Sequence, residues 1–174
     1  MKQIRVKNTS DQVFNKAWNL YEQAFPLEER RSIDAQCRVM KNPNYHFDIL
    51  RDEEQWIGFL LWWDLESLRY IDHFATDAQL RNKGFGKLIL EKFMASNDKP
   101  ILLEVELPTS HINKRRIKFY ERIGFKQNLH PYEVPAPSVG HAPLPFLLMS
   151  YPDTLSALEV EQFVKINHPI IFKD

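Results

Sequence analysis

The chain of 174 residues has few cysteines and glycines, no long apolar run and no excess of charge of one sign. It has one cysteine, Cys37, so an internal disulfide is excluded, a reducing compartment is expected, and the thiol is interpreted as a buried filler. The longest apolar run, residues 56–63, is far below the ~20 residues that cross a bilayer. Charge of one sign is also lacking, because 23 Lys and Arg balance 23 Asp and Glu. Such a chain gives no support for a nucleic-acid partner.

What is present is ordinary for a soluble globule. Hydrophobic residues make up 44% and charged residues 26% of the chain, which suits one domain with a real core. The N-terminus lacks an apolar signal core. We therefore expect a single domain over residues 1–174, in the cytoplasm and with no membrane partner.

Two of only 5 glycines, Gly84 and Gly86, stand at the start of an apolar helix expected over residues 88–95. A strand over residues 68–76 precedes them. Glycine lets the backbone approach a ligand, and the first N–H groups of a helix bind anions. Arg81, Lys83 and Lys87 surround the pair, so the segment favours a phosphate site over a simple turn.

The spacing distinguishes between types of phosphate loop. A Rossmann loop needs a third glycine where Ile89 stands, and a nucleoside-triphosphate loop needs Ser or Thr where Leu88 stands. Residues 81–86 (Arg-Asn-Lys-Gly-Phe-Gly) instead resemble the Gln/Arg-x-x-Gly-x-Gly/Ala loop of the GNAT N-acetyltransferase superfamily. Residues 113–125 resemble its Asn-helix-Tyr-Glu-x-x-Gly-Phe segment, and residues 101–107 its fifth strand. The resemblance covers residues 48–125 well.

The resemblance implies a GNAT-type α/β fold with a central, mixed, mostly antiparallel sheet of about seven strands flanked by helices. Its fourth and fifth strands are expected to be parallel and splayed. The residues agree, since short turns join residues 47–50, 56–65 and 68–76 antiparallel, whereas a helix before residues 101–107 favours a parallel pair.

Outside this region the elements are inferred from periodicity. A first strand is expected over residues 3–7, then a helix capped by Thr9 and Gln12 that ends at Pro26, and a second helix over residues 27–41. After a proline-rich connection we expect a strand over residues 145–151, a helix over 156–166 and an apolar tail over 169–172. The tail packs on the domain or meets a second subunit, so the protein is expected to be a monomer or a homodimer.

Four residues are candidates for catalysis, one as the acid and three as the base. The resemblance implies that Tyr120 lies near the thioester sulfur and protonates the leaving thiolate. An alkylammonium has a pKa of about 10, so the amine also needs a base. Asp72 lies among apolar neighbours, which predicts a raised pKa, and Glu104 on the fifth strand is its rival. His73 is a third possibility, although a lone strand histidine is more often structural.

The cosubstrate implied by the resemblance is acetyl-CoA, and no metal is expected. Loop amides would hold the pyrophosphate, the fourth strand would offer backbone to pantetheine, and an asparagine would bond the pantetheine arm. The predicted binding residues are Phe74, Ala75, Thr76, Arg81, Asn82, Lys83, Gly84, Phe85, Gly86, Lys87 and Asn113.

The function implied is transfer of acetyl from acetyl-CoA directly to a primary amine of a small-molecule or peptide acceptor. Residues that could meet the acceptor are Glu28, Glu29, Trp62, Trp63 and Tyr132; they could equally serve a helix dipole or fill the core. The alternatives are a non-catalytic acyl-CoA-binding module or sensor, and a nucleotide-binding protein that uses the same loop.

Overall fold

The computed structural model describes residues 1–135 and 142–173. They form two compact units, which are described separately: the first comprises Met1–Asp64 and Ile71–Ser96, the second Leu65–Tyr70 and the residues from Asn97 onward. The expectation of a single domain stays a prediction.

The first unit is built on four neighbouring strands. Its elements are β1 (Lys2–Arg5), α1 (Gln12–Ala24), the 3-10 turn η1 (Leu27–Glu29), α2 (Ile33–Val39), β2 (Tyr45–Asp52), β3 (Gln55–Asp64), most of β4 (Arg69–Thr76), the 3-10 turn η2 (Ala78–Leu80) and α3 (Phe85–Ala95). β1 pairs antiparallel with β2, and β2 antiparallel with β3, with a register shift between Leu50 and Arg51.

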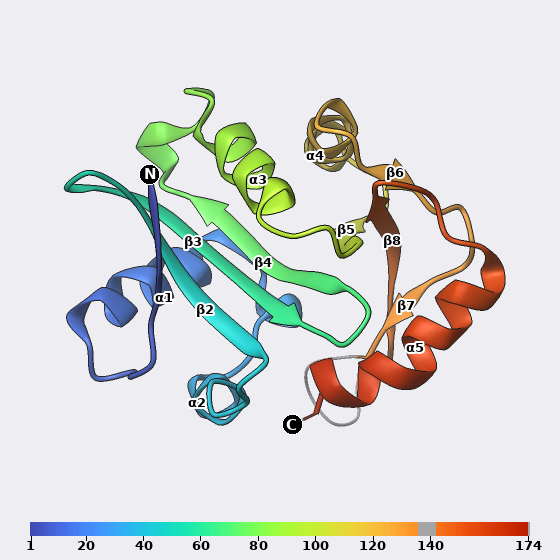
Figure 1. Ribbon diagram of the computed structural model, residues 1–174, viewed down its shortest axis with the longest axis horizontal. Helices are drawn as coiled ribbons and strands as arrows, with labels where there is room; N and C mark the ends of the chain where they lie inside the picture. The colour runs from blue at the N-terminus through green and yellow to red at the C-terminus, as the bar shows by residue number, and fades with distance from the viewer. Residues whose placement is uncertain (136–141, 174) are drawn as a thin grey trace. The chain divides into compact units, whose positions relative to one another are not determined.

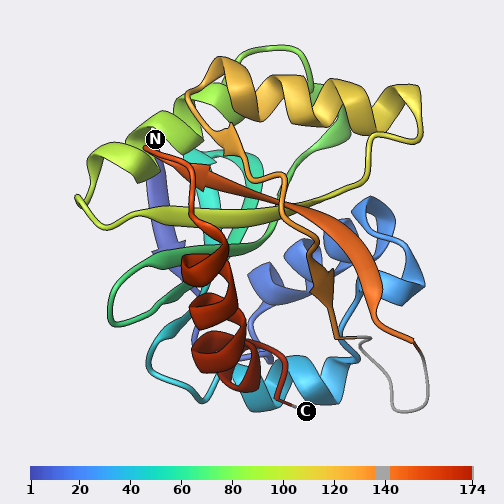
Figure 2. The same ribbon diagram turned by 90° about the vertical axis from the view of Figure 1, so that its right-hand side faces the viewer.

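Alternation along these strands gives the sheet two buried faces. On one face, Phe14 of α1 packs 5.2 Å from Phe47, between ring centroids, and Tyr21 packs 6.1 Å from Phe59. On the other, the Trp62 ring lies 5.0 Å from that of Phe93 in α3. α1 and α2 accordingly lie on one side of the strands and α3 on the other (Figure 2).

The second unit is organised around a long strand. Its elements are β5 (Ile101–Glu106), α4 (His111–Arg122), β6 (Lys126–Gln127), β7 (Glu133–Val134), β8 (Leu144–Tyr151) and α5 (Ala157–Ile171). β8 pairs antiparallel with β5, β6 and β7 (Figure 1). α4 covers one face of β5 and β8 and α5 the other (Figure 2).

The predicted fold class is confirmed as a mixed α/β fold with a parallel β4/β5 pair. The strand order is β1-β2-β3-β4-β5-β8-β6, with β7 joined to β8. The first residues of β4, Arg69 and Tyr70, themselves belong to the second unit, where the Arg69 amide donates to the Pro100 carbonyl (2.8 Å). The splay of the pair stays a prediction.

Three local predictions are wrong. The expected helix over residues 27–41 breaks into η1 and α2, because Arg30 and Ser32 are extended and the Ser32 side chain caps α2 through the Ala35 amide. α1 has Asp11 as its N-cap residue and lacks the expected Thr9 cap. α5 continues through Pro169 to Ile171, which is fully buried, so the expected tail is helical.

In the described part of the chain, no helix is long and apolar enough to cross a membrane.

Candidate functional site

The predicted phosphate loop, residues 81–87, lies in the first unit at the start of α3. Residues 81–84 and Lys87 are exposed. Asn82 and Gly84 both adopt left-handed backbone conformations, with φ of 64° and 86°. A Cβ built on Gly84 would meet no described atom within 4 Å, so the loop is open on that side.

The N-terminus of α3, like that of α1, has no side-chain cap, in contrast to α2, α4 and α5. Serine side chains cap α2, α4 and α5, accepting hydrogen bonds from the Ala35, Asn113 and Glu159 amides. α3 has Gly84 at its N-cap and Lys87 in its first turn, which contains no acidic residue. Its first-turn amides and helix dipole therefore suit an external anion.

The other predicted binding residues are placed as follows. Phe74, Ala75 and Thr76 form the half-buried end of β4. In this region β3 approaches closely, since a Cβ on Gly58 would lie 2.1 Å from the Ala75 carbonyl oxygen. Asn113 belongs to the second unit, where its side-chain amide donates to the Leu107 carbonyl (3.0 Å) at the end of β5.

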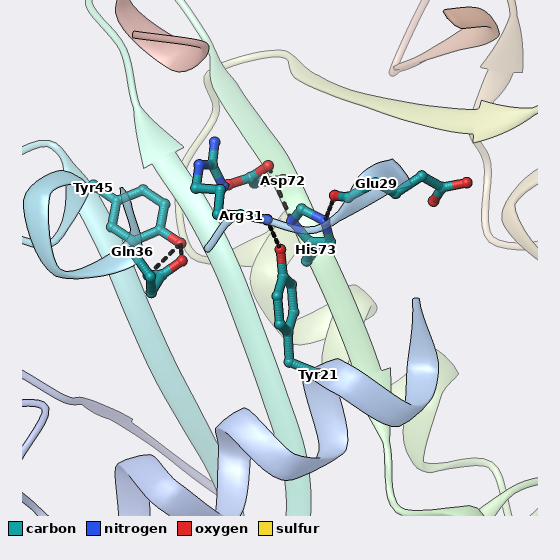
Figure 3. Close-up of polar contacts among 7 residues, drawn as sticks. All are labelled: Tyr21, Glu29, Arg31, Gln36, Tyr45, Asp72 and His73. Atoms are coloured by element: carbon teal, nitrogen blue, oxygen red, sulfur yellow. Dashed lines mark hydrogen bonds and ion pairs between the residues drawn. The ribbon is translucent and has the colours of Figure 1, made fainter. Parts of the chain in front are cut away.

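Asp72 lies at the centre of a buried polar cluster in the first unit (Figure 3). Its carboxylate forms an ion pair with the guanidinium of Arg31, from the segment between η1 and α2. Its other oxygen lies 3.1 Å from Nδ1 of His73. The Arg31 backbone amide donates to the Tyr21 hydroxyl of α1 (2.8 Å), so the cluster ties this segment to both α1 and β4.

The charge state of Asp72 follows from these contacts. Burial raises the pKa of the carboxyl, but Arg31 and then His73 oppose it and lower the pKa to about 2. The raised pKa expected from the sequence is therefore wrong, because the expectation included the apolar neighbours and missed the Arg31 guanidinium. Asp72 is fully ionised at neutral pH and is a weak base.

His73 lies between the Asp72 carboxylate and the Glu29 backbone. Its Nε2 lies 3.1 Å from the Glu29 carbonyl oxygen, opposite the Asp72 contact, and its ring meets those of Tyr21 and Phe25 edge-on. These contacts fit a structural histidine that fastens η1 to β4.

Glu104, in the second unit, belongs to a different cluster. The Tyr132 hydroxyl donates a close hydrogen bond to Oε1 of Glu104 and lies 2.8 Å from Nε2 of His168 in α5. Tyr132 and His168 are 5% and 8% exposed, whereas Glu104 is half-buried. A carboxylate from β5 is thus held by side chains from two other segments.

Tyr120 is buried in α4, where its ring meets Phe119 and Phe125 at centroid distances of 5.2 and 5.7 Å. Burial raises the pKa of its hydroxyl to about 12, partly opposed by Arg116, so the group is protonated at neutral pH. Arg116, whose role the sequence left open, pairs with Glu106 at 2.7 Å.

The residues suggested for the acceptor divide between core and polar roles. Trp63 is fully buried against Tyr45 and is a core residue. Trp62 is half-buried, stacks on His46 and donates to Asp48 (2.7 Å). Glu28 and Glu29 are first-turn acids of η1.

Comparison with known proteins gives the family. Residues 43–127 match a family model for the acetyltransferase (GNAT) domain. A solved candidate acetyltransferase of the GNAT family from Bacteroides thetaiotaomicron is 32% identical, with a TM-score of 0.87 over 97% of this chain and 98% of that one. The chain belongs to the GNAT family of acetyltransferases.

Two further similarities are consistent with this GNAT assignment. YjbC of Bacillus subtilis strain 168, named as a candidate acetyltransferase, is 31% identical over 114 residues, or 62% of this chain. The match spans 57% of that curated relative's length. An aminoglycoside 6′-N-acetyltransferase solved with coenzyme A is 17% identical, with a TM-score of 0.59 over 86% of this chain and 96% of that one, and shows the same fold.

The sequence of this GNAT protein did not point to Arg31 or His168 as members of these clusters, and it suggested Tyr132 only as an acceptor-pocket or core residue. Arg31 falls within the helix expected over residues 27–41. The signal that could have placed it before a helix is Ser32, an N-cap residue three positions before Ala35. His168 has no local signal for this role, because its side-chain hydrogen-bond partner, Tyr132, lies 36 positions away.

Proposed function

We propose that this protein is an acetyl-CoA-dependent N-acetyltransferase that moves acetyl directly to a primary amine. The observation that carries the proposal is the N-terminus of α3, which combines the GNAT loop motif with an open left-handed glycine and no acidic residue in its first turn. A thioester is already activated, so the protein needs only to position the reactants and to manage protons.

In this proposal the chain binds acetyl-CoA as a substrate. The amides of residues 82–87 receive the pyrophosphate, and Arg81 pairs with a phosphate oxygen. The backbone of Phe74, Ala75 and Thr76 meets the pantetheine amides, and Asn113 meets the pantetheine arm. The absence of acidic side chains from the first turn of α3 supports this assignment, since a diphosphate would be repelled by them.

Glu104 is the better candidate for the base. Asp72 is engaged by Arg31 and has a pKa of about 2, so it takes up a proton from an ammonium poorly. Glu104 is half-buried and accepts a close hydrogen bond from the neutral Tyr132 hydroxyl. In the proposed step an N–H bond of the acceptor breaks, an O–H bond forms on Glu104, and the amine nitrogen displaces the thiolate.

Tyr120 is proposed to assist the leaving thiolate. A thiol has a pKa of about 8.5, and Tyr120 has one of about 12, so full proton transfer would be uphill by about 5 kcal/mol. A hydrogen bond from the hydroxyl to the developing negative charge has no such penalty. We therefore assign Tyr120 as a hydrogen-bond donor to sulfur, with the final proton coming from solvent.

The test combines binding and turnover. Acetyl-CoA at millimolar concentration should raise the melting temperature by mass action, and Arg81→Gln should weaken this shift. Lys118→Gln, which removes an exposed cation from α4, is the matched control. An amine panel containing a small alkylamine, an amino acid, an aminoglycoside and a peptide with a free N-terminus should then release CoA thiol from acetyl-CoA.

Each outcome has a distinct meaning. The absence of any melting shift with folded protein overturns the proposal, and a shift with ATP but not CoA indicates a nucleotide-binding protein. Binding of acetyl-CoA without transfer to any amine of the panel indicates the acyl-CoA-binding module instead.

A further inference from the structure

The three side chains of the second unit, Glu104, Tyr132 and His168, form one continuous hydrogen-bonded chain. Glu104 comes from β5, Tyr132 from the segment between β6 and β7, and His168 from the last turns of α5. The Tyr132 hydroxyl lies between the other two, bonded to Oε1 of Glu104 and 2.8 Å from Nε2 of His168.

The number of protons on each group decides which residue donates each of these two hydrogen bonds. A tyrosine hydroxyl has one proton, and an ionised carboxylate only accepts, so that proton lies toward Glu104. Nε2 of His168 must then be the donor to the Tyr132 oxygen. A neutral imidazole has one N–H, so His168 is the Nε2–H tautomer.

The surroundings keep His168 neutral. Its ring is packed edge-on against Phe163 and Phe172, at centroid distances of 5.6 and 4.9 Å. Burial lowers the pKa of His168 to about 4. An uncharged donor suits this place, because a charged imidazolium would be desolvated among aromatic rings.

The strand partner of Glu104 is uncharged, and the second acid on its strand has its own cation. Glu104 faces Leu148 of β8 in the strand register, which carries no charge. Glu106, the second acid of β5, pairs with Arg116 of α4. Tyr132 reaches Glu104 from the segment before β7, and His168 of α5 contacts the same Tyr132 hydroxyl.

We infer that Tyr132 and His168 are positioning residues for acetyl transfer, holding one oxygen of Glu104 so that its carboxylate stays ionised and correctly oriented to take the amine proton. The inference rests on the proposed function. In the step an N–H bond of the acceptor breaks and an O–H bond forms on Glu104, while Tyr132 and His168 keep their own protons. A hydrogen bond to the ionised form of a carboxyl favours that form, which packing by a ring alone would not do.

The first test needs no acceptor. Carboxyl groups of glutamate labelled with 13C are titrated by NMR, with Glu104→Gln identifying the signal. In Tyr132→Phe, which keeps the ring and loses the hydroxyl, the midpoint of Glu104 should rise by about one pH unit. Tyr151→Phe, which removes the hydroxyl of another tyrosine in the second unit, should leave it unchanged. An unchanged midpoint in Tyr132→Phe overturns the inference.

The second test examines His168 directly. 15N NMR of labelled histidine should show the neutral Nε2–H tautomer at pH 7. His168→Gln can present an N–H at the same place and should preserve the Glu104 midpoint, whereas His168→Leu should raise it. A protonated ring or the Nδ1–H tautomer at pH 7 overturns the direction of the chain and the inference with it.

Kinetics distinguish positioning from a structural role. With the panel amine that is acetylated fastest, the acidic limb of the kcat/KM profile should move up by about one pH unit in Tyr132→Phe, a tenfold loss of rate below the limb. If the NMR midpoint of Glu104 shifts but the acidic limb of the kcat/KM profile does not, the three hydrogen-bonded residues have only a structural role, and the inference is overturned. Failure of acetyl-CoA to bind overturns the proposed function instead. The NMR results then describe hydrogen bonds to Glu104 in a protein that does not transfer acetyl groups.

Discussion

The Arg31 guanidinium and the Asp72 carboxylate, 41 positions apart in the sequence, form an ion pair in the interior of the first unit. Their side chains are 13% and 4% exposed. The pair fixes the segment between η1 and α2 to β4. It also keeps Asp72, which the sequence suggested as a base, ionised at neutral pH.

Breaking this pair on one side should be costly. Arg31→Met leaves a buried carboxylate without its cation, and we expect a loss of about 3 kcal/mol in the free energy of unfolding, measured by urea denaturation. The double variant Arg31→Met with Asp72→Leu should recover most of it, because neither charge remains buried. A single variant as stable as the wild type would contradict the prediction.

The same pair predicts how stability depends on pH. The pKa of Asp72 is about 2 in the folded protein, against an ordinary value of 3.8 for this carboxyl, so as pH falls the unfolded chain binds the proton first. The contribution is full above pH 3.8 and is lost as pH falls through 2. Between pH 5 and 2.5 the wild type should lose about 1–2 kcal/mol more than Asp72→Asn in urea denaturation. Parallel losses in the two proteins would show that Asp72 titrates normally.

Gly84 should be required because its backbone is left-handed, and not because a larger side chain would clash with its neighbours. Its φ of 86° is unfavourable for residues with a Cβ, and a Cβ there would contact no described atom within 4 Å. We expect Gly84→Ala to lower stability by about 1 kcal/mol and Gly84→Asn by about half as much, since asparagine enters this region more readily. Thermal unfolding without ligand measures both, and an alanine variant as stable as the wild type would be evidence against a left-handed loop.

Gly58 is constrained for the opposite reason. A Cβ at this position would lie 2.1 Å from the Ala75 carbonyl oxygen, which is backbone and cannot rotate away. Gly58→Ala must push β3 from the end of β4, and we expect a loss of more than ~3 kcal/mol in urea denaturation. Gly84→Ala serves as the control, because it adds the same methyl group where there is room. Equal small losses at both glycines would refute the close approach of the strands.

Tyr120→Phe should separate chemistry from binding. The ring contacts with Phe119 and Phe125 remain, so the melting temperature should stay near that of the wild type. Without the hydroxyl, kcat should fall about 100-fold, while the Kd for acetyl-CoA, measured by calorimetry, changes less than about twofold. Loss of acetyl-CoA binding in proportion to loss of turnover would mark Tyr120 as a structural residue.

Many helices and strands could be predicted from the periodicity of apolar residues and from the turn residues between them. Strands β2 to β4 and helices α1 and α3 lie within a few residues of the expected ranges, because alternation and apolar spacing are local signals. Strand β5 and helix α4 were expected from the family resemblance and also lie close to their expected ranges. The failures have different origins. Ser32 divides the expected second helix locally, whereas α5 runs through Pro169 because its buried face, with Phe163 and Ile171, continues past the proline.

The sequence by itself determined the loop at residues 81–87, since the left-handed turn and the uncapped helix start depend on which residues follow one another. Only the tertiary structure decided the partners of the carboxylates. Arg31 reaches Asp72 and Tyr132 reaches Glu104 across 41 and 28 positions, and each contact changes what the acid can do. Backbone preferences act between neighbours in the chain, whereas the charge state of a buried acid depends on whatever group folding brings beside it.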